Sequence, residues 1–430
     1  MTAIDRRTFV AASGAATLAA TTTRAQTDRN NTVRCAVLGV NGRGKVHIDA
    51  IENVPGAEVA LLCDPDAKVL HQRAGEFERK YGRRVETETD LRRVNDRSDI
   101  DVVSIATPNH WHALSSIWAC QAGKDVYLEK PGSHNLWEGR KMVEAAHRYH
   151  RIVQHGVQLR SNPKLQEAVQ LLRDGLIGDV YMARACVFRW RPSIGSQPNS
   201  TVPATLDWDM WQGPVAERPF STRYVHYNWH WHWDYGNGDI GNQGVHETDM
   251  ALWGLDEGLP TEITAMGGNF LWQDDRETPE VLSAMCRFGD SNKMLEIAVR
   301  PWCTNLEQGV GVGNLFYGSK GIMTIDNYNT YKTYLGRRRE PGPSGTSGDP
   351  LQAHFDNFFT AVRRRDPSEL NAPIETGHTS SGIAHLTNIS SRLGRQLKFD
   401  PQSEKFVGDA EADTMLTRIY RAPYVVPENV

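Results

Sequence analysis

The sequence predicts an α/β protein in which a parallel sheet wound by helices is followed by an antiparallel sheet. Between residues 33 and 149, short β-branched runs alternate with helical stretches, which is typical of βαβ units. Beyond residue 160 this alternation stops, and several strand-like runs follow one another without helices between them. The chain has 430 residues, too many for one small core, so we expect two domains.

The composition is that of an ordinary soluble globular protein. Apolar residues make up 39% of the chain and charged residues 23%, as is usual for this class. The net charge of −4 argues against a nucleic-acid binder, which usually presents a basic face. The six cysteines are scattered without a CxxC pair. They read as buried fillers, although Cys35 and Cys63 could sit on neighbouring strands and form a disulfide.

The N-terminus predicts export. A twin arginine, Arg6-Arg7, precedes an uncharged stretch, residues 8–23, which is too short and too weakly apolar to span a bilayer. The following "TRA" resembles a small-x-small cleavage site. This order of regions is typical of a twin-arginine signal over residues 1–25, removed on maturation in the periplasm. A disordered tail is the alternative. No other segment is predicted to cross a membrane.

In the first part of the chain, short predicted strands alternate with helices. The opening run "VRCAVLGV" reads as a strand buried on both faces, as parallel strands are. The predicted strands lie at residues 33–40, 57–64, 101–108 and 125–131. The predicted helices lie at residues 46–54, 112–123 and 136–149.

The first strand runs directly into the glycine-rich loop "GVNGRG", residues 39–44. Between a strand and a helix, glycines let the backbone turn tightly and approach a pyrophosphate at the helix N-terminus. Asn41 replaces the middle glycine of the usual fingerprint, and the turn should survive because asparagine tolerates a left-handed backbone. Asp64 ends the second strand, where a carboxylate accepts from a ribose 2′-OH and repels a 2′-phosphate. The pattern therefore favours NAD over NADP, although Asp64 and Asp66 could also cap the next helix.

Two more predicted strands end in polar motifs. "TPNHWH", residues 107–112, follows the third strand, whose carboxyl end faces the ligand crevice in such a sheet. Thr107 and Asn109 could line the cofactor, or Asn109 could cap the next helix. His110 and His112 point in different directions on a helix, which argues against a metal pair. "YLEKP", which ends the fourth strand, could face the ligand crevice, or it could be a solvent-exposed connection from the strand to the next loop (a solvated exit).

The second part reads as strands flanked by helices. Predicted strands lie at residues 180–191, 262–272, 280–289, 293–302 and 314–326. Predicted helices lie at residues 162–180 (ending at Gly175 or Gly178), 354–365 and 379–395. The segment 340–350 is rich in Pro, Gly and Ser and reads as a mobile surface loop.

An aromatic cluster and a histidine-bearing helix follow one another after residue 227. "NWHWHWDYGNG" crowds three Trp, two His and a Tyr into a turn-prone stretch. Such density favours ligand contact, with an aromatic plug as the alternative. "GNQGVHETDMALW" then reads as a loop entering a helix on which Asn242, His246 and Asp249 share one face.

These motifs resemble the glucose–fructose oxidoreductase/inositol dehydrogenase/MocA (Gfo/Idh/MocA) family. The resemblance runs through "GVNGRG", "CDPD", "ATPNHWH", "AGKDVYLEKP", "VQHGVQLR", "GNQGVHETDMALW", "FYGSKG" and "ETGHTSSGIAHLTNISSRLGR", and covers nearly all of the mature chain. It implies an NAD-binding Rossmann domain over residues 32–155. It also implies a substrate-binding α/β domain over residues 156–430, whose large open, mostly antiparallel sheet often mediates oligomers. We expect a homo-oligomer, a dimer or tetramer.

The resemblance also implies site roles. Lys130 would lie beside the nicotinamide and the reacting hydroxyl, and His246 would exchange the proton. Asn242 stands where the family often has an Asp, so Asp249 could orient the imidazole or Asp239 could replace the missing carboxylate. The expected cofactor contacts are Gly39, Asn41, Gly42, Arg43, Gly44, Asp64, Thr107, Pro108, Asn109, His112, Glu129 and Lys130. The expected substrate contacts are Arg160, Arg189, Asn228, Trp231, Asn242 and His246.

We expect no metal. His230, His232, Asp234 and His246 could be assembled into a zinc ligand set, but Lys130 beside that site would repel a cation, and the family chemistry needs none.

The expected function is that of an exported NAD-dependent oxidoreductase acting on a sugar, cyclitol or glycoside. Because a periplasm is not expected to supply free NAD, the cofactor should be tightly bound and loaded before export. An NAD-dependent glycosidase or epimerase that uses transient oxidation is one alternative. A non-catalytic sugar sensor is another.

Overall fold

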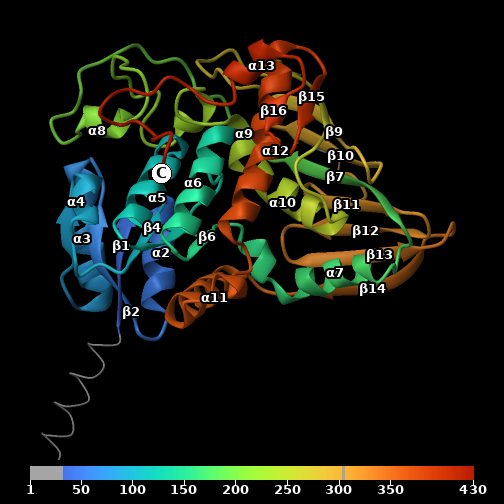
Figure 1. The fold of residues 1–430 in the computed structure, drawn as a ribbon, viewed down its shortest axis with the longest axis horizontal. Helices are drawn as coiled ribbons and strands as arrows, with labels where there is room; N and C mark the ends of the chain where they lie inside the picture. Colours follow the sequence, from blue (N-terminus) through green and yellow to red (C-terminus); the bar gives the residue numbers. More distant parts are fainter. Residues whose placement is uncertain (1–31, 303–305) are drawn as a thin grey trace, which may run out of the picture.

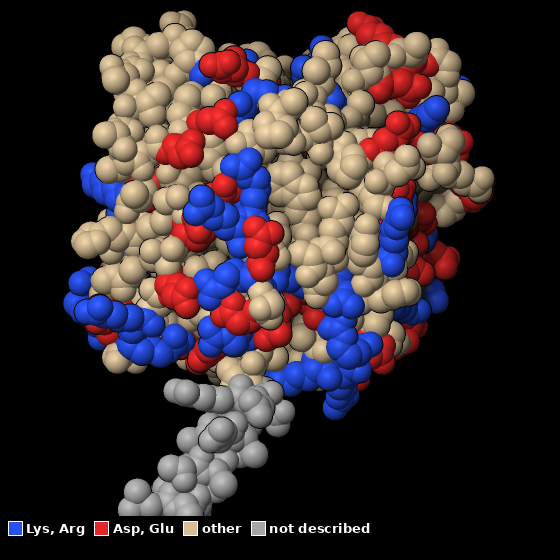
Figure 2. Space-filling view, turned by 60° about the vertical axis from the view of Figure 1, so that its left-hand side comes forward, with Lys and Arg blue, Asp and Glu red and all other residues tan. Residues whose placement is uncertain are grey.

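The computed structural model describes residues 32–302 and 306–430. The predicted twin-arginine signal lies outside these residues. Within the described part of the chain, no helix is long and apolar enough to cross a membrane. Acidic and basic side chains intermingle over the face shown in Figure 2.

The first sheet is the predicted parallel sheet. Its strands are hydrogen-bonded in the order β3-β2-β1-β4-β5-β6, and all pairs are parallel. The strands are β1 (Val33–Leu38), β2 (Ala57–Cys63), β3 (Glu86–Glu88), β4 (Val102–Ile105), β5 (Asp125–Leu128) and β6 (Val153–His155). The helices are α2 (Arg43–Glu52), α3 (Ala67–Tyr81), α4 (Leu91–Asn95), α5 (Asn109–Gln121) and α6 (Leu136–Arg148). The order reverses between β1 and β4, and doubly wound sheets bind ligands at the carboxyl ends of such strands.

The second sheet has ten strands in the order β14-β13-β12-β11-β7-β10-β9-β8-β15-β16. Only β7 and β10 pair in parallel; the other neighbours are antiparallel. The strands are β7 (Val180–Phe188), β8 (Glu262–Gly268), β9 (Val281–Phe288), β10 (Lys293–Arg300), β11 (Val312–Gly318), β12 (Gly321–Asp326), β13 (Thr330–Leu335), β14 (Glu340–Thr346), β15 (Leu397–Asp400) and β16 (Lys405–Phe406). The predicted fold class, a parallel α/β unit followed by an α/β unit with a large, mostly antiparallel sheet, is confirmed.

One face of the second sheet is covered by helices α7 (Pro163–Arg173), α10 (Gly244–Leu255) and α12 (Ile374–Leu393) (Figure 1). The other face is open, because side chains along β9 alternate between buried and exposed. Helix α10 is buried nearly all round, between the sheet and α12. This burial fixes the position of the predicted histidine helix.

The prediction of a mobile loop at residues 340–350 is wrong for most of this segment. Residues Glu340–Thr346 form β14, which pairs with β13 at the edge of the sheet. Pro341 and Pro343 lie on this edge strand, where a missing N–H costs least. The predicted strand 262–272 also ends early, at Gly268. The next residues turn away because the carboxylate of Glu280 accepts hydrogen bonds from the N–H groups of Phe270 (2.6 Å) and Trp272 (3.2 Å).

Helix α7 ends at Arg173, slightly before the predicted end. Gly175, just beyond, has φ of +75°, as a glycine that terminates a helix often does. Cys35 and Cys63 are free and buried, although they do lie on neighbouring strands. Cys35 pairs in register with Val59 and Cys63 with Leu38, so the two thiols are offset along the strands.

The two sheets interlock through the end of the chain. Helix α11 (Leu351–Arg364) returns to the first sheet and lies beneath it beside α2 (Figure 1). Phe355 stacks on Tyr127 of β5 with ring centroids 4.0 Å apart, and both side chains are fully buried. Tyr424 and Val426 of the C-terminal tail pack in the core on the other side of the same sheet. The first core is therefore completed by residues that follow the second sheet.

Residues 189–237, between β7 and α9 (Gly238–Asn242), form a long crossover segment. It includes α8 (Trp208–Gln212) and the 3₁₀ turn η2 (Asn228–Trp231). The segment lies against the end of β2: the N–H of Ala67 donates to Thr205 O (2.8 Å) and that of Asp207 to Pro65 O (2.9 Å). In Figure 1, α8 lies above the first sheet on this side. The crossover segment thus covers the carboxyl ends of the parallel strands.

Candidate active site

A cavity of about 440 Å³ lies at the carboxyl ends of the parallel strands, between the first sheet, the crossover segment and helices α9 and α10. Most of the predicted cofactor and substrate contacts line it. Those that line it are Gly39, Asn41, Gly42, Arg43, Asp64, Thr107, Pro108, Asn109, His112, Glu129, Lys130, Arg189, Asn242 and His246. Those that do not are Gly44, Arg160, Asn228 and Trp231.

The glycine loop is shaped for close approach. Gly39 has φ of +78°, and a Cβ there would lie 2.7 Å from Ala106 O. A Cβ on Gly42 would meet nothing within 4 Å, and α2 begins at Arg43 without a side-chain cap. The left-handed residue of the turn is Gly39, and Asn41 keeps a negative φ, which corrects the expectation. Gly44 packs against Gly39 O instead of the cavity. An uncapped helix N-terminus beside this open space is suited to an anion.

Asp64 ends the second strand facing the cavity. Its carboxylate accepts hydrogen bonds from Val40 N (3.0 Å) and Asp66 N (3.1 Å). Burial raises the pKa of this carboxyl to about 6. The helix cap is Asp66 alone, which accepts from Lys68 N (2.9 Å) and also contacts His226 Nε2 of the crossover segment (3.1 Å). Asp64 is therefore held in place by amides and keeps its outer lone pairs for a ligand hydroxyl.

The fourth strand ends in a buried ion network. Glu129 is 4% exposed, and its Oε1 accepts from Arg43 Nε (2.6 Å) and His47 Nε2 (3.0 Å). His47 Nδ1 lies 2.8 Å from the Ser104 hydroxyl. Burial alone would raise the pKa of Glu129, but Arg43 and His47 hold it well below its usual value. Glu129 is thus a fixed anion beside Lys130.

Lys130 points into the cavity and links the two parts of the chain. Its Nζ donates to the backbone oxygen of Asn242 (2.6 Å) and to Asn242 Oδ1 (3.2 Å). Burial lowers the pKa of Lys130 to about 8. "EKP" is therefore not a solvated exit, and the Lys130 ammonium forms no ion pair with the described residues, although the backbone N–H of Lys130 donates to Glu129 (3.1 Å).

His246 lies in the first turn of α10 and lines the same cavity. It is 6% exposed, and its Nδ1 has no hydrogen-bond partner. Burial, reinforced by the charge of Lys130, holds its pKa well below the usual value. The imidazole is thus neutral near pH 7 and able to accept a proton.

Neither predicted partner carboxylate reaches His246. Asp249 accepts instead from Arg160 Nε (2.9 Å) and from the Ser380 hydroxyl (2.6 Å). Three residues of helix carry Asp249 about 4.5 Å along the axis from His246, out of the cavity and into the contact with α12. Asp239 pairs with Arg191 (2.7 Å). The expectation that Asp249 orients the imidazole is therefore wrong, and the expectation that Asp239 replaces the missing carboxylate stays a prediction.

The aromatic stretch supplies both ligand-facing and packing side chains. Trp229 and His230 line the cavity, with their rings stacked at 3.6 Å. Trp231 instead lies 4% exposed between the guanidinium groups of Arg191 (5.4 Å) and Arg276 (5.7 Å). His232 packs behind the cavity. No group of three or more His, Cys, Asp or Glu in the described chain is placed to hold a metal ion.

Sequence reasoning missed several cavity residues. Tyr328 reaches the cavity from the β12–β13 turn, and its ring lies 5.4 Å from that of His246. Tyr328 has φ of +68° and follows Asn327 at +50°. The turn sequence "DNYN" could have signalled the hairpin, but not its position. Other missed side chains in the cavity are Gln158, Arg191, Met210, Trp211, His226 and Gln243.

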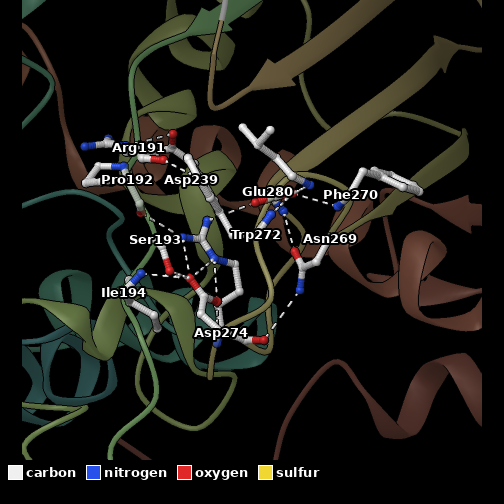
Figure 3. A network of polar contacts seen from close by, with 12 residues as sticks. Arg191, Pro192, Ser193, Ile194, Asp239, Asn269, Phe270, Trp272, Asp274 and Glu280 are labelled. Atoms are coloured by element: carbon white, nitrogen blue, oxygen red, sulfur yellow. Dashed lines mark hydrogen bonds and ion pairs between the residues drawn. The ribbon is translucent and has the colours of Figure 1, made fainter.

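A buried network fixes Arg191 at the cavity edge (Figure 3). Arg276 binds Asp274 (3.0 Å) and donates to Pro192 O (2.9 Å). The Asp274 and Glu280 side chains are fully buried. Trp272 Nε1 donates to Arg191 O (3.0 Å). The loop between β8 and β9 therefore clamps the start of the crossover segment.

Two family models match this chain. One, described as an oxidoreductase family with an NAD-binding Rossmann fold, matches residues 33–157. The other, described as the C-terminal α/β domain of that oxidoreductase family, matches residues 163–269 and 346–426. Fold and site thus define an NAD-binding oxidoreductase. The chain belongs to the Gfo/Idh/MocA family, and the expectation of an NAD(P)-dependent oxidoreductase is confirmed at this level.

Individual relatives share at most about a third of their residues with this chain in the three examples that follow. The rhizopine catabolism protein MocA of Rhizobium meliloti is 30% identical over 377 residues, 82% of this chain and 92% of that protein. An α-N-acetylgalactosaminidase of Shewanella oneidensis is 29% identical over 167 residues, 37% of this chain and 36% of that protein. The WlbA dehydrogenase of Bordetella pertussis, solved with NADH and UDP-GlcNAcA, has the same fold, with a TM-score of 0.64 at 22% identity over 86% of this chain and 99% of that one.

Proposed function

We propose that this protein is an exported NAD-dependent oxidoreductase that acts on a hydroxyl of a sugar, cyclitol or glycoside and keeps its cofactor through turnover. The observation that carries the proposal is that Lys130 and His246 line one cavity with the glycine loop and Asp64. A nucleotide site and a proton-accepting site thereby share one enclosed space, as hydride transfer from a carbinol requires.

The cavity fits NAD. The open space at Gly42 would take the pyrophosphate, and Asp64 would accept from the adenosine ribose and repel a 2′-phosphate. Thr107 Oγ1 is buried without a partner and lines the cavity, as a ligand contact would. When bound, NAD supplies the hydride acceptor. We therefore assign NAD in preference to NADP.

The proton chemistry falls to two side chains. His246, neutral near pH 7, would take the proton of the reacting hydroxyl. Lys130 would stabilise negative charge on that oxygen by a charge-assisted hydrogen bond. Asn242 holds Lys130 in place and offers its amide to a neighbouring hydroxyl.

The crossover segment supports a retained cofactor. Met210, Trp211 and His226 of this segment line the same cavity as Asp64 and Leu91 at its nucleotide end. A cofactor there would be covered by protein on both sides. Since a periplasm is not expected to supply free NAD, re-oxidation in place by a second substrate follows from retention.

Transient oxidation is the second candidate. The similarity to an α-N-acetylgalactosaminidase favours it, although that similarity spans little more than a third of either chain. The cofactor would then be reduced and re-oxidised within one catalytic cycle, and the net reaction would be hydrolysis or inversion.

Two measurements test the proposal. First, protein purified from the periplasm is denatured and the released nucleotide is quantified. We expect stoichiometric NAD(H), and its absence would overturn retention. Second, the intact holoprotein is mixed with sugars, cyclitols and glycosides while the near-ultraviolet absorbance of reduced nicotinamide is followed. Product analysis then separates net oxidation from hydrolysis or inversion. If no compound of these classes is converted, the assigned activity is wrong.

A further inference from the structure

The substrate end of the cavity carries an excess of positive charge. Lys130, Arg189 and Arg191 line this end. Among the described residues, only Asp64 and Glu129 bring carboxylates to the cavity. Asp64 lies at the nucleotide end, and Glu129 is paired with Arg43 (2.6 Å). The excess therefore faces the substrate.

Of these three cations only Arg191 forms an ion pair in the described chain, although the charge of Glu129 also acts on Lys130. Arg191 is paired with Asp239 (2.7 Å). The Arg189 side chain instead donates from Nη1 to the amide oxygen of Gln243 (2.6 Å), which is its sole side-chain hydrogen bond to the described residues, and it forms no ion pair with them. The Lys130 ammonium likewise donates only to the two oxygens of Asn242 among these residues. Arg189 is exposed and lines the cavity, so the rest of its guanidinium fork is available to a ligand.

The carboxyl that is connected to Arg189 through Gln243 does not neutralise it. Beyond Gln243, whose Nε2 donates to Glu247 Oε1 (3.2 Å), lies the fully buried side chain of Glu247. Burial raises the pKa of Glu247 to about 8. Glu247 is therefore mostly protonated near pH 7, and Gln243 connects it to Arg189 without balancing the charge.

We propose that Arg189 forms an anion subsite and that the physiological sugar carries an oxyanion group, a carboxylate or a phosphate ester, bound by its guanidinium. A guanidinium fork matches the geometry of either group. This inference rests on the proposed function, because it places the anion beside the hydroxyl that Lys130 and His246 would serve. It narrows the substrate class from sugars in general to acidic sugars.

The test compares matched probes on the holoprotein. Glucuronate, galacturonate and N-acetylneuraminate represent carboxylates, glucose 6-phosphate represents phosphates, and glucose, galactose and glucuronamide are the uncharged counterparts. Binding is measured by calorimetry, and turnover separately by nicotinamide absorbance. We expect at least one acidic probe to bind about ten-fold more tightly than its uncharged counterpart. Which acidic probe does so distinguishes a carboxylate from a phosphate ligand.

The variant Arg189→Gln should remove this preference. Arg287→Gln, which removes the same charge from the exposed face of β9, is the matched control and should keep the preference. The inference is overturned if no acidic probe binds better than its counterpart, or if Arg189→Gln leaves the preference intact. If only neutral sugars are turned over, the anion subsite is wrong and the proposed function stands. If acidic sugars bind selectively but no hydride is transferred, the proposed function is wrong and the anion subsite stands.

Discussion

At the scale of single residues, burial sets the chemistry of the site. Lys130 and His246 have pKa values below their usual ranges, in both cases chiefly because burial disfavours their charged forms. Lys130 nevertheless stays largely protonated near pH 7, whereas His246 stays neutral. One side chain can therefore donate to an oxygen while the other accepts a proton at the same pH.

The role assigned to Lys130 predicts that turnover falls at alkaline pH. Because burial lowers the pKa of Lys130 to about 8, the ammonium is lost as pH rises through that value, and turnover should fall with it. Lys130→Arg keeps the charge and should remove this alkaline limb. Lys130→Met should lower turnover by about 10²–10³-fold. The measurement is single-turnover reduction of the bound nicotinamide between neutral and alkaline pH. An unchanged limb in Lys130→Arg would assign it to another group.

A second prediction concerns His246. Replacement by glutamine keeps a polar side chain but removes the proton acceptor, so turnover should fall by about 10²–10⁴-fold. Sugar binding, followed by calorimetry, should change little. The exposed His147, which pairs with Glu375 away from the cavity, provides the control variant His147→Gln. If His246→Gln turns over a substrate at the native rate, the base lies elsewhere and a binding role for this cavity gains ground.

Local pattern predicts the site residues that follow predicted strands, and fails for those brought in by distant turns. The glycine loop, Asp64 and Lys130 each end a predicted strand of a parallel sheet, so topology alone places them together. Tyr328 comes from a hairpin of the second sheet, and no local signal ties it to His246. Arg160 was expected to contact the substrate, but its guanidinium pairs with Asp249 and does not line the cavity.

At the scale of elements, the crossover segment has a small core of its own. Phe220, Tyr224 and Tyr235 are buried in a cluster separate from the cores of the two sheets. A segment with a small core of its own can open without unfolding the molecule.

Weakening this cluster should release the cofactor. Phe220 is 3% exposed and does not line the cavity. Phe220→Ala should cost about 3–5 kcal/mol locally. We expect NAD(H) to be lost during dialysis and proteolysis to increase within residues 189–237. Phe288→Ala is the control, because Phe288 is 2% exposed in the core of the second sheet. It should lower Tm without selective loss of cofactor. Full retention by Phe220→Ala would remove the segment as the reason for retention.

The sequence predicts helices and strands correctly where apolar residues recur with a clear period. It fails where the amino-acid composition is typical of another kind of structure. Helices α7 and α12 follow from their apolar spacing. Strand β14 could not be predicted from the sequence, because its Pro and Gly content is typical of loops. Edge position makes that composition tolerable, and edge position is a property of the whole sheet that no short window of sequence reveals.

At the scale of the whole molecule, the open face of the second sheet carries exposed apolar side chains. Met266 is 80% exposed on β8 and Met285 is 45% exposed on β9. Apolar side chains gathered on one sheet face favour burial against a partner. The expectation of a homo-oligomer stays a prediction.

The oligomer is tested by light scattering on the purified protein. We expect a dimer or tetramer, and the double substitution Met266→Glu with Met285→Glu should shift it toward monomers because it would bury unpaired charges. Bound NAD(H) should be unaffected, since neither residue lines the cavity. A native protein that is monomeric at micromolar concentration would contradict the prediction.

The return of α11 to the first sheet has a consequence for the order of synthesis. Tyr127 packs against Phe355 and Phe358 of α11, which leave the ribosome after almost the whole second sheet. The nucleotide-binding half therefore cannot finish folding as it emerges, although all six of its strands are made first. For the same reason, exchanging that half between relatives would require cutting the gene in more than one place, so that the late helix travels with the early strands.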